Sequence, residues 1–368
     1  MAGRIVMHVD FDYFYAQCEE IRNPIMKTRP VCVCVYSDRG GDSGAIATAN
    51  YIAREYGVKS GMPISFAKRK LADADGAEFI PVDFEYYSQV SEESMEEIAK
   101  FADVFEYVGR DEAYLDVGAR TEFSFDAAAR LGQQIKNAVR TKTKIVCSIG
   151  ISPNRMISKI ASDHKKPDGL TIVRPDSVNA FLEPLEIVKI PGIGKKTEQR
   201  LSRIGLKTIR DLKNADLFLL AKEFGRKSGT YIYNAARGVD EEPVKERAPR
   251  IQYSRIVTLS EDSGRYEFLK ESLARICSDV HGTVMENRQM FKVVGVQFVK
   301  SDLSVMSRSR TLKSPTASAY ELQKNAEYLL AEALKSQGAN MSVRRLGVRV
   351  TELSDARGQS DITSFFKP

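Results

Sequence analysis

The sequence predicts a multidomain protein of mixed α/β and α+β class. Strand and helix patterns alternate over the first half, short helices with glycine turns follow from about residue 174, and a separate strand and helix series begins near residue 250. At 368 residues the chain is also too long for one comfortable hydrophobic core. With 43% hydrophobic and 28% charged residues, its composition is that of an ordinary soluble globular protein.

In the first half, short apolar runs predict strands and longer amphipathic runs predict helices. Residues 104–108 and 113–117 flank a turn at 109–112 and should form a hairpin. The other expected strands are 4–9, 30–37 and 144–152, and the expected helices are 43–58, 88–103 and 124–141.

The second half begins with short helices around IPGIGKKTEQRLSRIG, and the polar segment 240–249 is typical of a linker. The order after it is strand, helix, strand, strand, helix, strand, which predicts a compact α+β unit. Its expected elements are 252–259, 265–286, 291–299, 303–312, 316–337 and 343–353. The last 15 residues lack core-forming spacing and should form a flexible tail.

The five cysteines have no C-x-x-C spacing and the three histidines are scattered, so a His/Cys metal cluster is not indicated. Cys32 and Cys34 alternate with valines, which favours buried free thiols in a reducing compartment. No apolar run approaches the length that spans a bilayer, and the N-terminal residues do not resemble a signal peptide. We therefore expect a cytoplasmic protein without a membrane partner.

The positive charge gathers in one segment. Residues 244–350 hold 18 Lys and Arg against 11 Asp and Glu, whereas residues 1–243 hold 35 of each. A solvated basic surface and a domain that follows a phosphate backbone both fit this excess.

Carboxylates stand at the ends of two predicted strands. Asp10 and Asp12 follow the first strand, and Asp111 and Glu112 lie at the tip of the hairpin. Buried acids need a positive partner, and a pair of Mg²⁺ ions would supply one. Two such ions clamp the attacking and leaving oxygens of a phosphoryl transfer. Asp12 and Asp111 could instead be turn or capping residues.

A resemblance becomes specific at this point. VDFDYFYAQCEE, SGAIATANYIAREYGVKSGMP, DEAYLDV and SIGIS followed by KIASDHKKPDG are similar, in this order, to the Y-family DNA polymerases of the DinB/kappa branch. The similarity runs from about residue 4 to residue 350. It implies an error-prone, template-directed polymerase for translesion synthesis, which would work as a monomer on primer-template DNA and dNTPs.

The resemblance implies a right-hand polymerase with a ferredoxin-like palm, small fingers, a helical thumb and an α+β little-finger domain. Expected bounds are 1–13 and 81–173 for the palm, 14–80 for the fingers, 174–240 for the helix-hairpin-helix thumb, 241–249 for the linker, 250–352 for the little finger and 353–368 for the tail.

It also implies roles for single residues. Asp10, Asp111 and Glu112 would be catalytic ligands of two Mg²⁺ ions, with Mn²⁺ as an alternative, and the carbonyl of Phe11 would add one oxygen. Tyr15, with Phe14 beside it, would be the steric gate, because a ring under the sugar leaves no room for a 2′-hydroxyl. The alternative for Tyr15 is a core aromatic.

Residues that suit the triphosphate come from two segments. Thr48, Tyr51 and Arg54 are spaced i, i+3 and i+6, which would keep them near one face of the expected helix 43–58. Lys166, in KKPDG, matches the second cation that the family places on the triphosphate, whereas Lys159 is expected at the surface. Without the family, Arg54 and Lys166 would be interpreted as solvated charges.

One position departs from the family, which usually has a serine and an apolar residue before the Asp-Glu pair. Here these positions hold Gly109 and Arg110. An arginine beside two acids could pair with them and compete with Mg²⁺, or it could point away.

Two features suit DNA. Gly192 and Gly194 of the IPGIG turn, followed by Lys195, could hold a phosphate at a helix N-terminus, with an ordinary glycine loop as the alternative. In the basic segment, arginines near the predicted strands could contact the sugar-phosphate backbone; these are Arg255, Arg308, Arg310 and the pair Arg344–Arg345.

The tail reads QSDITSFF. Gln359, Ile362, Phe365 and Phe366 match the interaction box for a PCNA-type sliding clamp, which together with the chain length favours an archaeal source.

Two other classes of protein remain as alternatives. One is a different two-metal nucleotidyl enzyme such as a cyclase, because GGDS at 40–43 superficially resembles a cyclase loop. The other is a DNA-binding scaffold without activity.

Overall fold

The computed structural model describes residues 4–246, 249–337 and 341–356. The chain packs into two units. Of the described residues, the first unit takes most of those up to 246, and the second takes those from 249 onward together with Val35–Ala45 and Pro63–Phe66.

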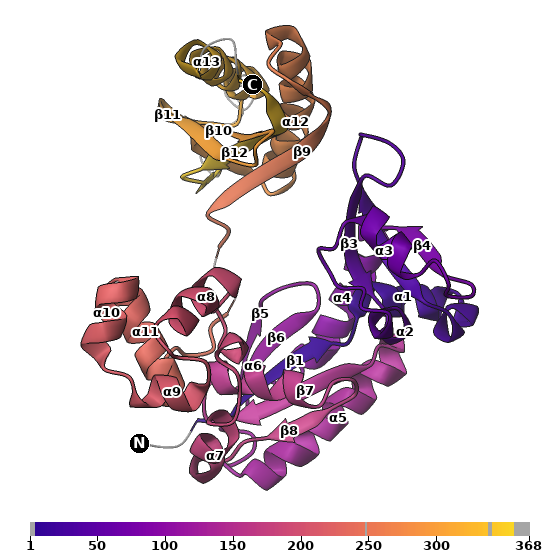
Figure 1. Cartoon of the computed structure of the whole chain (residues 1–368), viewed down its shortest axis with the longest axis vertical. Helices are drawn as coiled ribbons and strands as arrows, with labels where there is room; N and C mark the ends of the chain where they lie inside the picture. Colours follow the sequence, from indigo (N-terminus) through magenta and orange to yellow (C-terminus); the bar gives the residue numbers. More distant parts are fainter. Residues whose placement is uncertain (1–3, 247–248, 338–340, 357–368) are drawn as a thin grey trace, which may run out of the picture. The chain divides into compact units, whose positions relative to one another are not determined.

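The main sheet of the first unit has the strand order β5-β6-β1-β7-β8 (Figure 1). β1 lies in the middle, antiparallel to both β6 and β7, while β8 runs parallel to β7. β5 and β6 form the expected hairpin. The bounds are β1 Val6–Phe11, β5 Val104–Tyr107, β6 Glu112–Asp116, β7 Cys147–Ser152 and β8 Leu170–Ile172.

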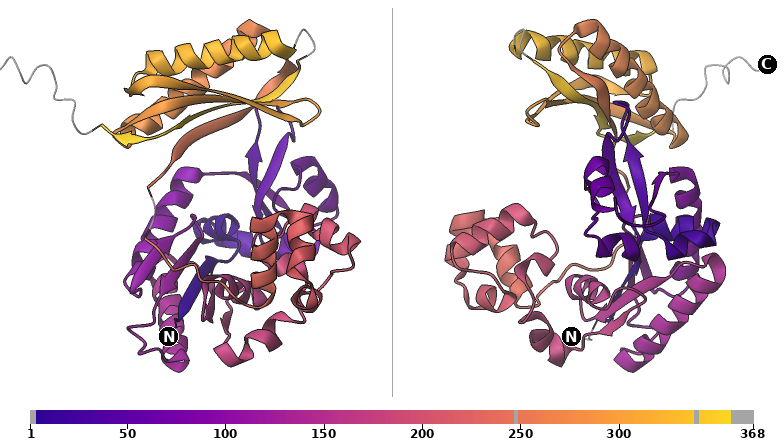
Figure 2. Two further views of the ribbon diagram at one scale, coloured as in Figure 1. Left: turned by 90° about the vertical axis from the view of Figure 1, so that its left-hand side faces the viewer. Right: turned by 45° about the vertical axis from the view of Figure 1, so that its right-hand side comes forward.

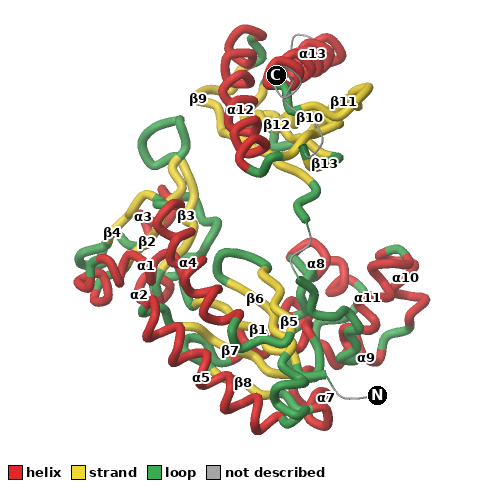
Figure 3. The backbone as a smooth tube through the Cα atoms, turned by 180° about the vertical axis from the view of Figure 1, so that it is seen from behind, coloured by secondary structure: helices red, strands yellow, loops and turns green. Residues whose placement is uncertain are grey.

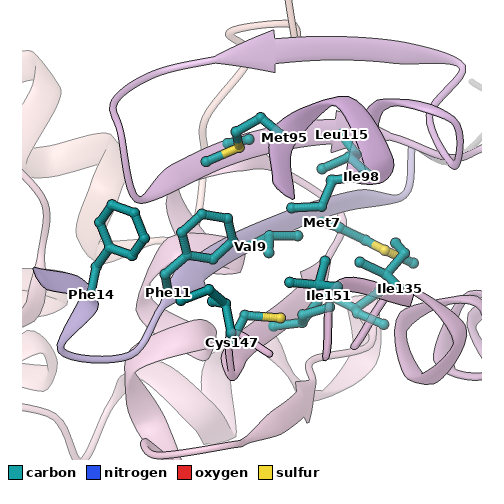
Figure 4. Packing of buried hydrophobic residues seen from close by; sticks show 14 of the residues in the cluster. Met7, Val9, Phe11, Phe14, Met95, Ile98, Leu115, Ile135, Cys147 and Ile151 are labelled. Carbon is teal, nitrogen blue, oxygen red and sulfur yellow. The ribbon is translucent and has the colours of Figure 1, made fainter. Parts of the chain in front are cut away.

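The two faces of β1 have different environments because side chains alternate along a strand. Met7, Val9 and Phe11 point into the main hydrophobic core (Figure 4). His8 and Asp10 point to the opposite face, which carries the carboxylates. This alternation lets one strand both close a core and present an acid.

Helices cover both faces of this sheet. α4 (Phe84–Ala99) and α5 (Phe125–Thr143) supply core residues such as Ile98 and Ile135, and α6 (Arg155–His164) packs against β1 and β7 on the other face. Gly150 permits this approach, since a Cβ there would lie 2.0 Å from the carbonyl oxygen of Ser158.

A smaller sheet has the order β3-β2-β4. Its strands are β2 Val31–Tyr36, β3 Gly44–Ala49 and β4 Glu78–Pro81, and the helices nearby in sequence are α1 Phe14–Arg22, η1 Pro24–Thr28, α2 Tyr51–Glu55 and α3 Ile64–Lys70.

The expected single helix at 43–58 is wrong, because residues 44–49 form β3 and only Tyr51–Glu55 is helical. Gly44 has a φ of 150° and approaches the backbone of Val35 too closely for any side chain. Asn50 then ends the strand and caps α2 by accepting a hydrogen bond from the N–H of Ala53 at 3.0 Å.

Short helices follow the main sheet in the sequence, as the glycine turns in this stretch predict (Figure 3). They pack around a core that includes Leu201, Leu212 and Leu220. Their bounds are η2 Pro175–Ser177, α7 Val178–Leu182, η3 Ile187–Lys189, α8 Lys195–Arg203, α9 Ile209–Asn214, α10 Leu217–Phe224 and α11 Arg226–Ala236.

The segment after α11 lies against the main sheet. Arg4 donates hydrogen bonds to the carbonyl oxygens of Asp240, Glu241 and Glu242, and Val244 is buried against β1 and β6. The first part of the expected linker is therefore bound to the first unit.

The second unit has the predicted order of strands and helices, with a sheet ordered β11-β10-β12-β9. Both helices pack on the same face of this sheet (Figure 2). The bounds are β9 Gln252–Ser263, α12 Tyr266–Glu286, β10 Gln289–Lys300, β11 Val305–Thr316, α13 Ala319–Gln337, β12 Val343–Thr351 and β13 Ser354–Asp355.

All five cysteines are buried thiols that form no disulfide, as the sequence predicts. Among the described residues, no helix is long and apolar enough to cross a membrane.

Candidate active site

Strand pairing brings the predicted carboxylates together. Asp10 of β1 lies directly opposite Glu112 of β6, and the N–H of Phe11 donates to the carbonyl oxygen of Asp111 at 2.7 Å. One ligand atom each of His8, Asp10 and Glu112 lies within 4.8 Å of the others. Asp111 is exposed beside them. The site is therefore rich in carboxylate oxygens, the ligands that a hard divalent cation prefers.

Two side chains hold Glu112. Nε2 of His8 lies 3.2 Å from Oε2 of Glu112, and the ammonium of Lys159 contacts the same oxygen. The hydrogen bond from His8 and the charge of Lys159 outweigh the effect of burial and lower the pKa of Glu112 to about 2. Lys159, expected at the surface, is thus part of the site.

Sequence reasoning missed His8. Its ring is fully buried, and its two nitrogens face Ser162, at 2.8 Å, and Glu112. Burial lowers the pKa of His8 to about 4, so the ring is neutral near pH 7. The available signal was the spacing, because residues two apart on a strand share a face and His8 is two residues before Asp10.

Asp10 has a cationic partner of its own. The ammonium of Lys166 contacts Oδ1 of Asp10 and lies 2.8 Å from Asp163. Burial raises the pKa of Asp10 to about 7 although Lys166 opposes this shift. Burial alone would lower the pKa of Lys166, but Asp10 and Asp163 raise it overall. A positive charge beside the partly desolvated carboxylate of Asp10, here the ammonium of Lys166, favours its ionised form.

Asp12 is separate from this cluster. It is completely buried and accepts hydrogen bonds from the hydroxyl of Ser148, at 2.9 and 3.0 Å, and from the N–H of Asp168 at 2.8 Å. Its carboxylate therefore joins β1 and β7 to the loop after α6.

Arg110 points away from the acids. Its Nε donates to the hydroxyl of Ser88 at 3.0 Å, and its guanidinium lies 5.3 Å from the ring centre of Phe84, both on α4. A Cβ on Gly109 would meet Asp111 at 3.5 Å, an ordinary contact. The two unusual residues thus leave the carboxylates accessible.

An aromatic cluster surrounds the expected steric gate. The ring of Tyr15 stacks on that of Tyr87 with centres 4.6 Å apart and planes 16° apart. Phe14 and Phe84 pack around it at 5.5 and 6.1 Å. Phe14 itself is buried, whereas Tyr15 is half-buried. The ring of Tyr15 is therefore held in one orientation.

The three residues expected on one helix face come from two elements. Thr48 lies on β3, while Tyr51 and Arg54 lie on α2, so the argument from helical spacing is wrong. The Arg54 guanidinium lies 4.9 Å from the centre of the Tyr51 ring and donates to the carbonyl oxygen of Ala49 at 2.9 Å. Within the described part of the chain, the buried hydroxyl of Tyr51 has no hydrogen-bond partner.

The IPGIG turn leads into α8. Gly192 has a φ of 84°, Gly194 is the residue before Lys195 at the start of α8, and all three are exposed. The hydroxyl of Tyr231 donates to the carbonyl oxygen of Pro191 at 2.5 Å and braces the turn. The exposed backbone at this helix N-terminus suits an anion.

Three of the arginines singled out in the second unit, Arg255, Arg308 and Arg310, lie on its helix-covered side. Arg308 donates to Ser336 of α13 at 2.9 Å, Arg310 lies 4.5 Å from the ring centre of Tyr328, and Arg255 faces Asp279 of α12 at 3.7 Å. Arg344 lies 3.7 Å from Asp262.

The open face of that sheet carries Arg345, which the sequence analysis names together with Arg344, and also Arg349, which sequence reasoning did not select. On β12, Leu346, Val348 and Val350 point into the core, so Arg345 and Arg349 point the opposite way, and both are exposed. Arg349 extends over Gly295, where a Cβ would come within 2.8 Å of its Nε. The alternation of apolar and charged residues in VRRLGVRV is the sequence pattern that indicates this open face.

The expected clamp-binding box lies outside the described residues. Its four named residues are Gln359, Ile362, Phe365 and Phe366.

Models of known protein families match most of the chain. Residues 9–163 match the impB/mucB/samB family, residues 188–240 match the thumb domain of DNA polymerase iota, and residues 250–362 match the impB/mucB/samB C-terminal domain. Two proteins named DNA polymerase IV are similar over nearly their full lengths. The one from Nitrosopumilus maritimus is 63% identical, covering 100% of both chains, and the one from Methanosarcina acetivorans is 39% identical, covering 99% of this chain and 100% of its own.

Solved structures agree with this assignment. The Y-family DNA polymerase chimera Dbh-Dpo4(243-245)-Dbh is 35% identical with a TM-score of 0.89, covering 95% of this chain and 99% of that one. The insertion ternary complex of Dbh DNA polymerase is also 35% identical, with the same coverage and a TM-score of 0.68. The fold is that of a right-hand polymerase, and the chain belongs to the Y-family of DNA polymerases, in its DinB branch, as a DNA-directed DNA polymerase.

Proposed function

We propose that the protein adds dNTPs to a primer 3′-hydroxyl by a two-metal nucleotidyl transfer with Mg²⁺. The observation that carries this proposal is the cross-strand pair of Asp10 and Glu112, with Asp111 beside it. These carboxylates and the carbonyl oxygen of Phe11 form an oxygen-rich donor set, which fits Mg²⁺ and also Mn²⁺. When bound, the ions supply positive charge for the reacting phosphate oxygens.

The protein's own side chains then bind and orient the nucleotide. Tyr51 supports a triphosphate site because its buried hydroxyl is without a partner in the described structure, and Arg54 lies against its ring. Thr48 adds a hydroxyl from the neighbouring strand. Lys166, charged beside Asp10, supplies a second cation. Tyr15, fixed by its stacking on Tyr87, packs under the sugar and excludes a 2′-hydroxyl.

DNA contacts follow from the two exposed basic features. The turn at Gly192 and Gly194, with Lys195, holds a backbone phosphate. Arg345 and Arg349, on the open face of the second unit, contact further phosphates. These contacts do not read bases, which suits an enzyme whose template supplies the sequence.

Primer extension with dNTPs and Mg²⁺ tests the proposal. Asp10→Asn should lower extension by roughly a thousandfold, since it removes a charged ligand. Asp116→Asn is the matched control, because Asp116 lies at the other end of β6 and its Oδ1, which accepts from Gly118, is kept in asparagine. Equal loss in both variants would contradict the carboxylate site. Formation of a cyclic nucleotide from GTP would instead support a cyclase. DNA binding without primer extension would support a DNA-binding scaffold.

Synthesis across damaged templates is the second part of the proposal. It is supported by the family and by the small residues on β3, Gly44, Ala45, Ala47 and Ala49. Extension past an abasic site, compared with an undamaged template, measures it. A complete stop one nucleotide before the lesion would contradict it.

The tail at 359–366 is proposed to bind a PCNA-type clamp. Its deletion should abolish stimulation of extension by the clamp and leave synthesis without clamp unchanged. Loss of both activities would instead assign the tail a structural role.

A further inference from the structure

Lys136 is a buried lysine that the reaction does not use directly. It lies on α5, and only 6% of the residue is exposed. Its ammonium has three N–H groups and meets three acceptors, all in the loop after α6. These are the carbonyl oxygen of Asp168, the carbonyl oxygen of Gly169 at 3.2 Å and Oδ1 of Asp168 at 2.9 Å. A buried charge is tolerated only when it is so completely paired.

Two backbone N–H groups of the same loop are also bound. The N–H of Asp168 donates to the buried carboxylate of Asp12 at 2.8 Å, and the N–H of Gly169 donates to the hydroxyl of Ser148 at 3.1 Å. Asp168 itself has a φ of 56°, a left-handed conformation that needs support in a residue other than glycine. Lys136 binds the carbonyl oxygens of Asp168 and Gly169. The N–H groups and the carbonyl oxygens of both residues therefore have partners.

Lys166 stands two residues before this anchored backbone and reaches Asp10 and Asp163. We infer that Lys136 is a positioning residue: its contacts with the backbone of Asp168 and Gly169 hold the loop where the ammonium of Lys166 meets the triphosphate of the incoming dNTP. This inference rests on the proposed role of Lys166.

Arg140 also contacts Asp168, but it is half-exposed and does not position the loop as Lys136 does. It donates to Oδ2 of Asp168 at 2.7 Å, but its side chain is 49% exposed and it contacts the carboxylate alone. An exposed pair of this kind is weakened by solvent. Lys136 contacts the backbone itself from a buried position, so it constrains the path of the loop.

Single-turnover incorporation gives the apparent Kd for dNTP and the maximal rate, and thermal unfolding reports the fold. Lys136→Met should weaken dNTP binding about tenfold and change the maximal rate by less than about twofold, because a misplaced binding group lowers affinity. Lys142→Met, the same change at an exposed position of α5, is the control and should leave both unchanged.

A double-variant comparison separates positioning from general damage. Lys166→Ala should weaken dNTP binding by itself, and adding Lys136→Met should then weaken it no further, because the anchor acts only through Lys166. If the two effects multiply, or if folded Lys136→Met binds dNTP normally while Lys166→Ala does not, the inference is wrong and the proposed role of Lys166 stands. If Lys166→Ala binds dNTP normally, both are wrong.

Asp168→Asn gives a second route should Lys136→Met fail to fold. Asparagine tolerates the left-handed conformation and leaves both carbonyl contacts of Lys136 in place. The variant weakens the third contact, the ion pair of Lys136 with Asp168, so the ammonium of Lys136 is held less firmly against those carbonyl oxygens. We expect about threefold weaker dNTP binding that vanishes in the Lys166→Ala background. Unchanged binding, or weakening that persists in that background, would overturn the inference.

Discussion

Asp10 and Glu112 face each other across adjacent antiparallel strands, although 102 positions separate them in the sequence. Each carboxylate has its own lysine, Lys166 for Asp10 and Lys159 for Glu112. His8, on the same strand face as Asp10, reaches across to Glu112 as well. The backbone register of β1 and β6 therefore sets the spacing of the acids, and the side chains from α6 and the following loop set their charge.

Arg110 should be dispensable for catalysis, because its side chain binds Ser88 and Phe84 of α4 and not the carboxylates. We expect the double variant Gly109→Ser, Arg110→Ile to keep or raise kcat, within about threefold. Steady-state primer extension measures it, with Arg110→Met alone as the control. A loss of more than a hundredfold would show that Arg110 takes part in the reaction.

Tyr15→Ala should admit ribonucleotides, because it removes the ring that Tyr87 holds in place. We expect the ratio of kcat/KM for dNTP to that for rNTP to fall by at least about a hundredfold. Tyr15→Phe keeps the ring and should keep the ratio. Unchanged sugar selectivity in Tyr15→Ala would refute the gate.

Sequence reasoning went furthest where a pattern is local. The order of elements in the second unit follows from alternating apolar residues and helical spacing, and the structure has that order. The meeting of Asp10 with Glu112 is different, since strand pairing over such a separation cannot be read from periodicity. The family resemblance supplied that step.

The region 43–58 shows how a tertiary contact overrides a local pattern. Its alanines favour a helix, but Gly44 lies against the backbone of Val35 and extends the chain into β3. Asn50 accepts from the N–H groups of both Val31 and Ala53 and so joins the neighbouring strand to the new helix. Neither contact is visible in the sequence alone.

In the sheet of the second unit, the alternation of side chains was visible in the sequence but was not used to assign the arginines to a face. Arg308 and Arg310 do share one face, yet Met306 and Leu312 have the same parity on β11 and pack against the core. That parity assigns the two arginines to the side of α13. Counting apolar residues first would have placed Arg345 on the open face and would have added Arg349 to it.

The salt dependence of DNA binding should therefore separate the two faces. Replacing Arg345 and Arg349 by Ala should lower the slope of log K against log salt by about two, because each phosphate contact contributes about 0.9. Replacing Arg308 and Arg310 by Ala should leave the slope unchanged. Titrations of primer-template DNA between low and moderate salt measure both, and a change only in the second pair would reverse the assignment.

Asp168 should make the fold sensitive to acid. Burial pushes the pKa of its carboxyl up, but hydrogen bonds from Lys136 and Arg140 outweigh this and hold it below the ordinary value of 3.8. In the unfolded chain the carboxyl takes up its proton near 3.8, before the folded chain does. Its stabilising contribution is therefore complete above about pH 4 and is lost as the pH falls through the lower, folded-state pKa.

Asp168→Asn lacks this titration. Urea unfolding at pH 7, 5, 4 and 3 should show the wild type more stable than Asp168→Asn above pH 4, with the gap narrowing below it. Other carboxylates also titrate in this range, but they do so in both proteins and cancel in the difference. The narrowing reports the ion pairs of Asp168 with Lys136 and Arg140. A gap that stays constant from pH 7 to pH 3 would mean that asparagine perturbs the loop by its shape and that the charge of Asp168 contributes nothing.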